Sequence, residues 1–343
     1  MNVLFIGLGG VGQRHLRVLK KLFPLAKVYA VRKKNISHEI NDQLQLDTNV
    51  NIEEKYNITI CKTIADAICF NLDFAIVCNP TSLHIDSALV LIENKVPVLI
   101  EKPLSNNNNN IIKLLKLSKK NNTIFSVAFM MRYHPCFAKL RSYIDNNAIG
   151  RIYNVNIDVN SYFPSWHNYE KYTELYAGRS ALGGGVVLTE IHEIDLLNVL
   201  FGKPKSLLAI GGKRSALDID VEDNVSVLLE FKKNDYEFAS SINMSFVQKT
   251  PYRSMRILGE HGSILWDMVK GVITLDNYTD NISKTDSFED FHRNDMFEDQ
   301  LSYFIKLINN EALFDQALND SIGGHKIVMG IKESLSSGAI INF

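Results

Sequence analysis

Hydrophobic residues recur in two different patterns along the chain, and the change falls near residue 122. Before it, short apolar runs alternate with segments whose apolar residues recur at helical spacing. The runs predict buried strands at Val3–Ile6, Ala26–Val31, Phe74–Val77 and Val96–Ile100, with helices at Val11–Leu22, Ile85–Asn94 and Ile111–Leu117. Because parallel strands need a crossover helix between them, this alternation predicts a doubly wound parallel sheet in an α/β domain.

The second part of the chain consists mostly of short strand candidates separated by hairpin-sized gaps. Thr123–Ala128 is expected to be the last strand of the first sheet, and Phe137–Asn146 a helix. Further strands are expected at Arg151–Val159, Lys205–Ile210, Ser226–Phe231, Glu237–Met244, Ser254–Leu258, Ser263–Asp267 and Val272–Asp276, and helices at Asp295–Leu307 and Ile322–Ser336. We therefore predict one domain over 1–122 and an α+β domain with a large, mostly antiparallel sheet over 123–343. In this arrangement the C-terminal helix, expected at Ile322–Ser336, can pack against the first domain.

Composition narrows the class of protein. A chain of 343 residues with 46% hydrophobic residues is long enough for two domains, and its net charge of −1 argues against a nucleic-acid binder. The four cysteines form no CxxC pair, which is typical of reduced thiols in a cytoplasmic protein. The chain carries no apolar stretch of the ~20 residues that a membrane helix needs, and its first residues do not resemble a signal peptide.

A glycine-rich turn lies between the first strand and the first helix. Its residues Gly7, Gly9, Gly10, Val11 and Gly12 match the G-x-G-x-x-G pattern. Glycines allow a tight turn there, so that a pyrophosphate can approach the helix N-terminus, where unpaired N–H groups attract anions. The alternative is a turn that only reverses the chain, but this position in a β-α-β unit favours a dinucleotide site.

The end of the second strand bears on which dinucleotide is bound. NAD-preferring proteins place a carboxylate there for the ribose hydroxyl, whereas this chain has Arg32 and Lys33. An arginine can pair with a 2′-phosphate, so NADP is favoured over NAD. An ordinary basic loop is the alternative.

Two further loops are expected at the same edge of the sheet. Glu101 and Lys102 follow the strand Val96–Ile100, and Pro103, next in the chain, can form a cis bond. The loop after Phe74–Val77 contains Asn79, Pro80, Thr81 and His84. Ligands of open α/β sheets bind at the carboxyl ends of the strands, so both loops are candidates for cofactor contacts.

Together these motifs resemble the glucose–fructose oxidoreductase / inositol dehydrogenase / MocA (Gfo/Idh/MocA) family over nearly the whole chain. The motifs that match are GLGGVG at 7–12, NPTSLH at 79–84, EKPL at 101–104, MRYHP at 131–135, AIGR at 148–151, GGGVVLTEIHEID at 183–195, VEDN at 221–224 and SLSSG at 334–338. YFPSW at 162–166 and YTELYAGRSALGGG at 172–185 are similar to the branch associated with sugar and surface-polysaccharide metabolism. The resemblance implies a Rossmann domain followed by a domain for substrate binding and oligomerisation.

The family's chemistry is hydride transfer between a nicotinamide and a carbon that bears a hydroxyl or keto group. By resemblance the general base is His192 and its assistant is Lys102. Histidine suits this role because its pKa lies near neutrality, and a lysine can stabilise the charge that develops on the reacting oxygen. A buried structural histidine on an expected helix over Val186–Leu200 is the alternative.

One feature departs from the family pattern. Many members carry an aspartate four residues before the histidine, where this chain has Leu188. Asp195 lies on the same expected helix face as His192 and is a candidate for orienting it. A salt bridge without a catalytic role is the alternative for Asp195.

Other polar and aromatic residues near these motifs are candidate substrate contacts: Lys102, Arg132, Tyr133, Trp166, Tyr172, Tyr176, Arg179 and His192. Arginines can hold a phosphate or carboxylate and aromatic rings stack on sugars, although the same rings can serve only packing. We expect no metal site, because the histidines show no ligand spacing.

We therefore expect a cytoplasmic NAD(P)-dependent oxidoreductase that acts on a small sugar derivative. A nucleotide-activated sugar used in surface glycan synthesis is one such candidate substrate. Alternatives on the same fold are a reductase of a non-sugar substrate such as a bilin and a non-catalytic nucleotide-sensing regulator. No nucleic-acid or membrane partner is expected, and a homodimer or homotetramer is expected by resemblance.

Overall fold

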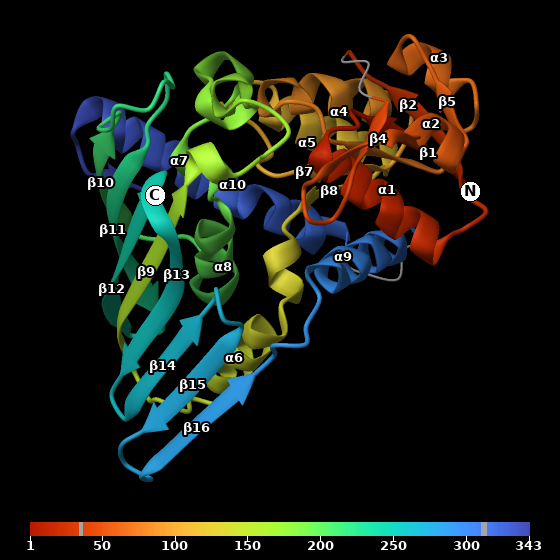
Figure 1. The fold of residues 1–343 in the computed structure, drawn as a ribbon. Helices are drawn as coiled ribbons and strands as arrows, with labels where there is room; N and C mark the ends of the chain where they lie inside the picture. Colours follow the sequence, from red (N-terminus) through yellow and green to blue (C-terminus); the bar gives the residue numbers. More distant parts are fainter. Residues whose placement is uncertain (34–36, 310–313) are drawn as a thin grey trace.

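Two β-sheets of different kinds form the frame of the molecule, one in each domain (Figure 1). The computed structural model describes residues 1–33, 37–309 and 314–343. The first sheet has six parallel strands in the order β5-β2-β1-β6-β7-β8. They are β1 (Asn2–Ile6), β2 (Lys27–Val31), β5 (Ile58–Ile60), β6 (Phe74–Val77), β7 (Val98–Glu101) and β8 (Phe125–Ala128). The predicted doubly wound Rossmann sheet is thus confirmed, and it ends at Ala128, after residue 122.

Helices separate these strands along the chain. They are α1 (Gly10–Leu22), α2 (Ile52–Tyr56), α3 (Ile64–Ile68), α4 (His84–Glu93) and α5 (Ile111–Asn121), with the short 3₁₀ helix η1 (Thr81–Leu83) before α4. The small hairpin of β3 (His38–Ile40) and β4 (Leu46–Asn51) follows β2 and was not predicted, because its strands are short and half-polar.

The second sheet has nine strands in the order β16-β15-β14-β13-β9-β12-β11-β10-β17. They are β9 (Ile152–Tyr162), β10 (Ser206–Gly212), β11 (Asn224–Lys233), β12 (Tyr236–Ser245), β13 (Val247–Gly259), β14 (Gly262–Asp267), β15 (Val272–Asn277), β16 (Ile282–Ser287) and β17 (Ile341–Asn342). Only β9 and β12 pair in parallel, so the predicted mostly antiparallel sheet is confirmed.

Helices cover the face of this sheet that is turned toward the first domain (Figure 1). They are α6 (Pro135–Asp145), α7 (Val186–Thr189), α8 (His192–Phe201) and α10 (Phe314–Ser337). Helix α9 (Arg293–Ile308) instead packs on α1 of the first domain (Figure 1). The 3₁₀ helices of this part of the chain are η2 (Met130–Tyr133), η3 (Phe163–Ser165), η4 (Tyr172–Glu174), η5 (Tyr176–Gly178) and η6 (Ser180–Leu182). Helix α10 also reaches the first sheet, where Ser321 bonds the amide of Val127 on β8 at 3.3 Å. In the described part of the chain, every helix is too short or too polar to span a lipid bilayer.

The single helix expected over Val186–Leu200 is wrong: the chain breaks between α7 and α8, and His192 begins the second helix. The break leaves the carbonyl oxygen of Thr189 without a helical amide, and Lys102 donates a hydrogen bond to it at 2.8 Å. Hydrophobic periodicity does not reveal such a break, because the residues on both sides of it, 186–197, are all buried.

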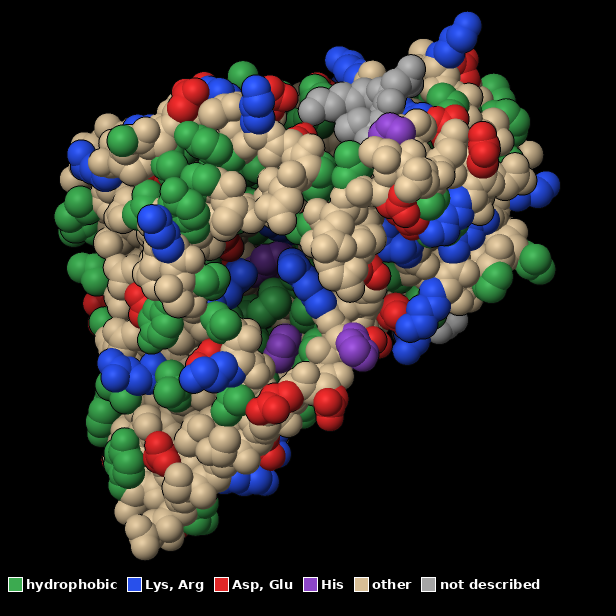
Figure 2. Space-filling view, in the orientation of Figure 1, with side chains coloured by type: hydrophobic (Ala, Val, Ile, Leu, Met, Phe, Trp, Pro, Cys, Tyr) green, Lys and Arg blue, Asp and Glu red, His purple; other side chains and the backbone are tan. Residues whose placement is uncertain are grey.

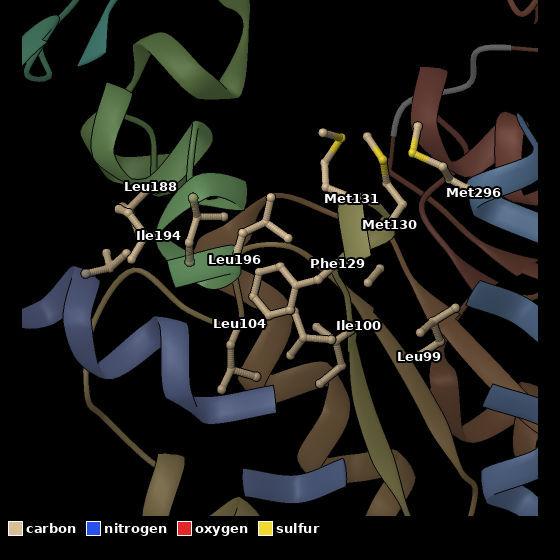
Figure 3. Packing of buried hydrophobic residues seen from close by; sticks show 14 of the residues in the cluster. Leu99, Ile100, Leu104, Phe129, Met130, Met131, Leu188, Ile194, Leu196 and Met296 are labelled. Atoms are coloured by element: carbon tan, nitrogen blue, oxygen red, sulfur yellow. The ribbon is translucent and has the colours of Figure 1, made fainter. Parts of the chain in front are cut away.

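The two domains share one hydrophobic core (Figure 3). Leu188, Ile194 and Leu196 of the second domain lie close to Ile100, near the end of β7, and to Phe129, which follows β8. All five side chains are buried. Close packing of this kind is rigid, so it fixes the relative position of the two walls of the cleft that is described below.

Candidate active site

The glycine loop has the shape that a dinucleotide requires. Gly7 has φ +94°, and a Cβ there would lie 2.7 Å from the carbonyl oxygen of Cys78. A Cβ on Gly12 would lie 2.6 Å from the oxygen of Gly7. Gly9 caps α1 and faces open space, with no atom within 4 Å of the position of a Cβ. The loop is therefore tight where it packs on the strands and open where a pyrophosphate would meet the N-terminus of α1.

Arg32 already has an acidic neighbour. It follows β2, and its guanidinium forms an ion pair with Glu53 in the first turn of α2. Burial lowers the pKa of Arg32 from its usual value. Lys33 is exposed to solvent. The end of β2 thus carries a cation, as the sequence indicates, together with a carboxylate that sequence spacing did not reveal.

His84 ties together the two loops that were expected beside the cofactor. Its ring nitrogens lie 2.9 Å from the carbonyl oxygen of Asn79 and 2.8 Å from that of Pro103. The side chain of Asn79 donates to Ser87 at 3.0 Å, while Pro80 precedes η1 and Thr81 lies buried. His84 is buried and holds the loops by hydrogen bonds, which fixes the edge of the sheet where Lys102 emerges.

Lys102 lies at the end of β7 and points across to the second domain. Its peptide bond to Pro103 is cis, and its ammonium group donates to Thr189 as described above. Glu101 is buried and accepts a hydrogen bond of 2.7 Å from His15 on α1. Burial lowers the pKa of Lys102, and the nearby carboxylates of Glu101 and Glu190 partly oppose that decrease.

His192 faces the same part of the cleft from the start of α8. Its side chain is 5% exposed, and its Nδ1 has no hydrogen-bond partner among the described residues. Burial, followed by the charges of Lys102 and Arg253, holds the pKa of His192 well below its usual value. The imidazole is therefore neutral at pH 7, which is the form that can accept a proton.

Asp195 is paired with Arg132. The guanidinium donates two hydrogen bonds to the carboxylate, at 2.7 and 2.6 Å, and a third to the carbonyl of Asp320 at 2.8 Å. Arg132 also stacks on Phe129, whose ring lies 6.4 Å from that of His192. The two residues that were expected to contact histidine and substrate thus hold each other. Leu188, the residue that departs from the family pattern four positions before His192, is buried in the core.

Residues that sequence reasoning missed complete the cleft. Arg253 on β13 binds the buried carboxylate of Glu193 and lies 3.4 Å from Glu190. Arg293, the first residue of α9, is exposed, and its charge lowers the pKa of both Lys102 and His192. No ion pair joins Arg293 to another described residue. Figure 2 shows a hollow between the domains with Lys and Arg side chains on its walls and histidine inside.

The remaining predicted contacts lie on the segment from Tyr162 to Gly183 and on η2. Tyr176 lies near Glu101 and Glu190, whose charges add to the effect of burial in raising its pKa. Trp166 donates to Ser161 at 3.2 Å, and Arg179 donates to the carbonyl of Thr173 at 2.6 Å. Tyr172 accepts a hydrogen bond from the amide of Asp218 at 3.2 Å, and Tyr133 packs near Tyr303. Of these side chains, Tyr176 is the one with charge interactions to both walls of the cleft. Among the described residues, no three potential metal ligands gather at one point.

Fold and site together define a class: a two-domain oxidoreductase whose first domain binds a nicotinamide dinucleotide. The description "Oxidoreductase family, NAD-binding Rossmann fold" belongs to a family model that matches residues 1–129. The GFO/IDH/MocA C-terminal domain matches residues 137–265. The chain therefore belongs to the Gfo/Idh/MocA family and is an NAD(P)-dependent oxidoreductase of the sugar-dehydrogenase type.

Individual relatives differ in substrate and cofactor. Myo-inositol 2-dehydrogenase of Thermotoga maritima is 24% identical over 321 residues, 90% of this chain and 89% of that protein. The scyllo-inositol 2-dehydrogenase (NADP(+)) of Bacillus subtilis is 25% identical over 207 residues, 60% of each chain. The WlbA dehydrogenase structure from Bordetella pertussis, in complex with NADH and UDP-GlcNAcA, has a TM-score of 0.77 at 19% identity, covering 100% of this chain and 98% of that one.

Proposed function

We propose that this protein transfers a hydride between NADP and a hydroxyl-bearing or keto carbon of an anionic sugar derivative, such as a nucleotide-activated sugar. The observation that carries the proposal is that Lys102 of the first domain binds the carbonyl of Thr189, three residues before His192, and that its charge lowers the pKa of His192. The glycine loop would hold the pyrophosphate of the dinucleotide, and the nicotinamide would supply the hydride chemistry. His192, neutral at pH 7, accepts the hydroxyl proton, and Lys102 donates a hydrogen bond to the same oxygen.

The charges of the cleft support an anionic substrate. The guanidinium of Arg253 is balanced by Glu190 and Glu193, whereas Arg293 has no ion-pair partner in the described part of the chain. Arg132 and Arg179, the arginines first expected to hold the anion, have hydrogen-bond partners in the protein. A phosphate or carboxylate would therefore be placed nearest to Arg293. Relatives that act on inositols and one solved with a UDP-sugar are consistent with a sugar substrate.

NADP preference rests on Arg32, which must exchange its bond to Glu53 for one to the 2′-phosphate. The first experiment is a fluorescence titration of the purified protein with NADPH and NADH, followed by turnover assays of nucleotide sugars with NADP. Tighter NADPH binding supports the proposal. Tighter NADH binding would contradict the role of Arg32 and leave that of Lys102 and His192 standing. Absence of binding, with no cofactor released on denaturation, would overturn the proposed reaction.

We further propose a cytoplasmic homodimer or homotetramer that associates through the uncovered face of the second sheet. Exposed apolar side chains on this face support the proposal, among them Ile210 on β10, Leu228 on β11 and Leu265 on β14. Burying such residues favours association of symmetric copies. Light scattering of the purified protein tests it, and a monomer at micromolar concentration would contradict it.

A further inference from the structure

A segment of the second domain crosses to the cofactor edge of the first. It is anchored at its start, where Phe163 is fully buried and stacks on Phe246 with ring centroids 4.9 Å apart. It is anchored again at its end, where Gly183 has φ +80° and a Cβ would lie 2.8 Å from that of Thr81 in the first domain. The residues between these two anchors therefore lie across the boundary between the domains.

Tyr169 lies in the middle of this segment and reaches the glycine loop. A Cβ on Gly10 would lie 2.8 Å from the hydroxyl oxygen of Tyr169, which is closer than side chains approach one another. Leu44 and Ile40 surround the same position at 3.5 and 3.8 Å. Gly10 is the first residue of α1, so the hydroxyl lies beside the helix N-terminus and next to the open space at Gly9.

The chemistry of the hydroxyl suits an anion. Its ring is half-buried and stacks on His167 with centroids 4.9 Å apart, which holds its direction. Burial and the charge of Glu170 raise the pKa of Tyr169, so the phenol keeps its proton and can donate it to a hydrogen bond. No hydrogen bond joins Tyr169 to another described residue. A donor without an acceptor therefore stands beside a helix end that attracts phosphates.

We propose that the Tyr169 hydroxyl binds the pyrophosphate of the dinucleotide, so that a residue of the second domain completes the cofactor site. The pyrophosphate is common to NAD and NADP. Tyr169 therefore strengthens binding of both by the same factor, in contrast to Arg32, which discriminates between them.

The test is the substitution Tyr169→Phe, which removes only the hydroxyl, followed by titration with NADH and with NADPH. Both dissociation constants should rise about tenfold, which is typical of losing a hydrogen bond to a charged acceptor. Tyr153→Phe is the matched control, because Tyr153 is 58% exposed on β9, and it should leave both constants unchanged. Unchanged or tighter binding by Tyr169→Phe would overturn the proposal. If the wild-type protein binds neither dinucleotide, the proposed reaction fails as well, so the two failures are distinguishable.

A second measurement checks the position of Tyr169 without any cofactor. Gly10→Ala should lower the melting temperature of the wild-type protein, because the new Cβ meets the hydroxyl oxygen. In the Tyr169→Phe background that atom is absent, and the decrease should be smaller. Equal decreases in both backgrounds would show that Tyr169 does not lie over Gly10 in solution, which also overturns the proposal.

Discussion

The two walls of the cleft are held in place in different ways. On the first-domain wall, the ring of one side chain, His84, contacts a backbone carbonyl in each of the loops that follow β6 and β7, and so ties the two loops together. On the second-domain wall, side-chain charges pair over long stretches of sequence, Arg132 with Asp195 and Arg253 with Glu193. On the first wall only substitution of His84 removes these contacts, because their partners are backbone carbonyls, whereas each ion pair of the second wall is broken by substitution of either of its two residues.

The largest effect should come from the residue that joins the walls. Lys102→Met removes the donor to the reacting oxygen and the bond to Thr189, and turnover should fall by about a thousandfold or more. Dinucleotide affinity should stay within about a few fold, since the glycine loop is independent of Lys102. Lys113→Met, at an exposed position of α5, is the control. Unchanged turnover in Lys102→Met would contradict the mechanism.

A second substitution tests whether the ion pair between Asp195 and Arg132 on the second-domain wall stabilises the fold. Asp195→Asn leaves the Arg132 guanidinium without its carboxylate, and the free energy of unfolding should fall by about 2–3 kcal/mol. The side chain of Asp195 is 1% exposed and that of Arg132 is 20% exposed, so solvent relieves part of the loss. Asp145→Asn breaks an exposed pair with Arg141 and should cost little. A large loss of turnover at unchanged stability would instead assign Asp195 to orienting His192.

These pairs also show what the sequence could and could not predict. Strand ends and glycine turns follow from neighbouring residues, so Gly7, Lys102 and the parallel, doubly wound character of the first sheet were predictable. Arg253 reaches Glu193 across 60 residues, and hydrophobic periodicity contains no signal for that contact. The break before His192 was missed because it changes backbone bonds and leaves the apolar pattern intact.

The pH dependence of kcat/KM for substrate oxidation depends on the pKa of His192, and therefore on the charges around it. Its pKa is held well below 6.5, so the neutral base persists and the acid limb of kcat/KM should lie below pH 6.5. Removing a nearby cation favours the protonated imidazole. Arg293→Gln should therefore move this limb to higher pH. A limb that does not move would show that Arg293 and His192 do not interact.

The smallest effect should come from the first wall, at the Arg32–Glu53 pair. Glu53→Gln removes the carboxylate that pairs with Arg32 and competes with a 2′-phosphate, and NADPH should bind about threefold more tightly, as expected for a partly exposed ion pair. NADH affinity should not change, because it lacks the 2′-phosphate. Arg32→Ala should weaken NADPH alone. If either substitution changes the affinities for NADPH and NADH by the same factor, Arg32 does not bind the 2′-phosphate.

The borders of the large sheet affect how the protein behaves when it is concentrated. One outer strand, β16, has the sequence ISKTDS and consists almost wholly of hydroxyl-bearing and charged residues, while the opposite outer strand, β17, is only two residues long. Long, flat, apolar outer strands recruit strands of other chains and start fibrous aggregates. β17 pairs only with Ser206 and Leu207 of β10. The rest of β10, Leu208–Gly212, is short, ends in two glycines and has its Ala209 amide bonded to Ser334, so neither border offers a long apolar template. Solutions of the folded protein should therefore resist fibril formation, even though the sheet is nine strands wide.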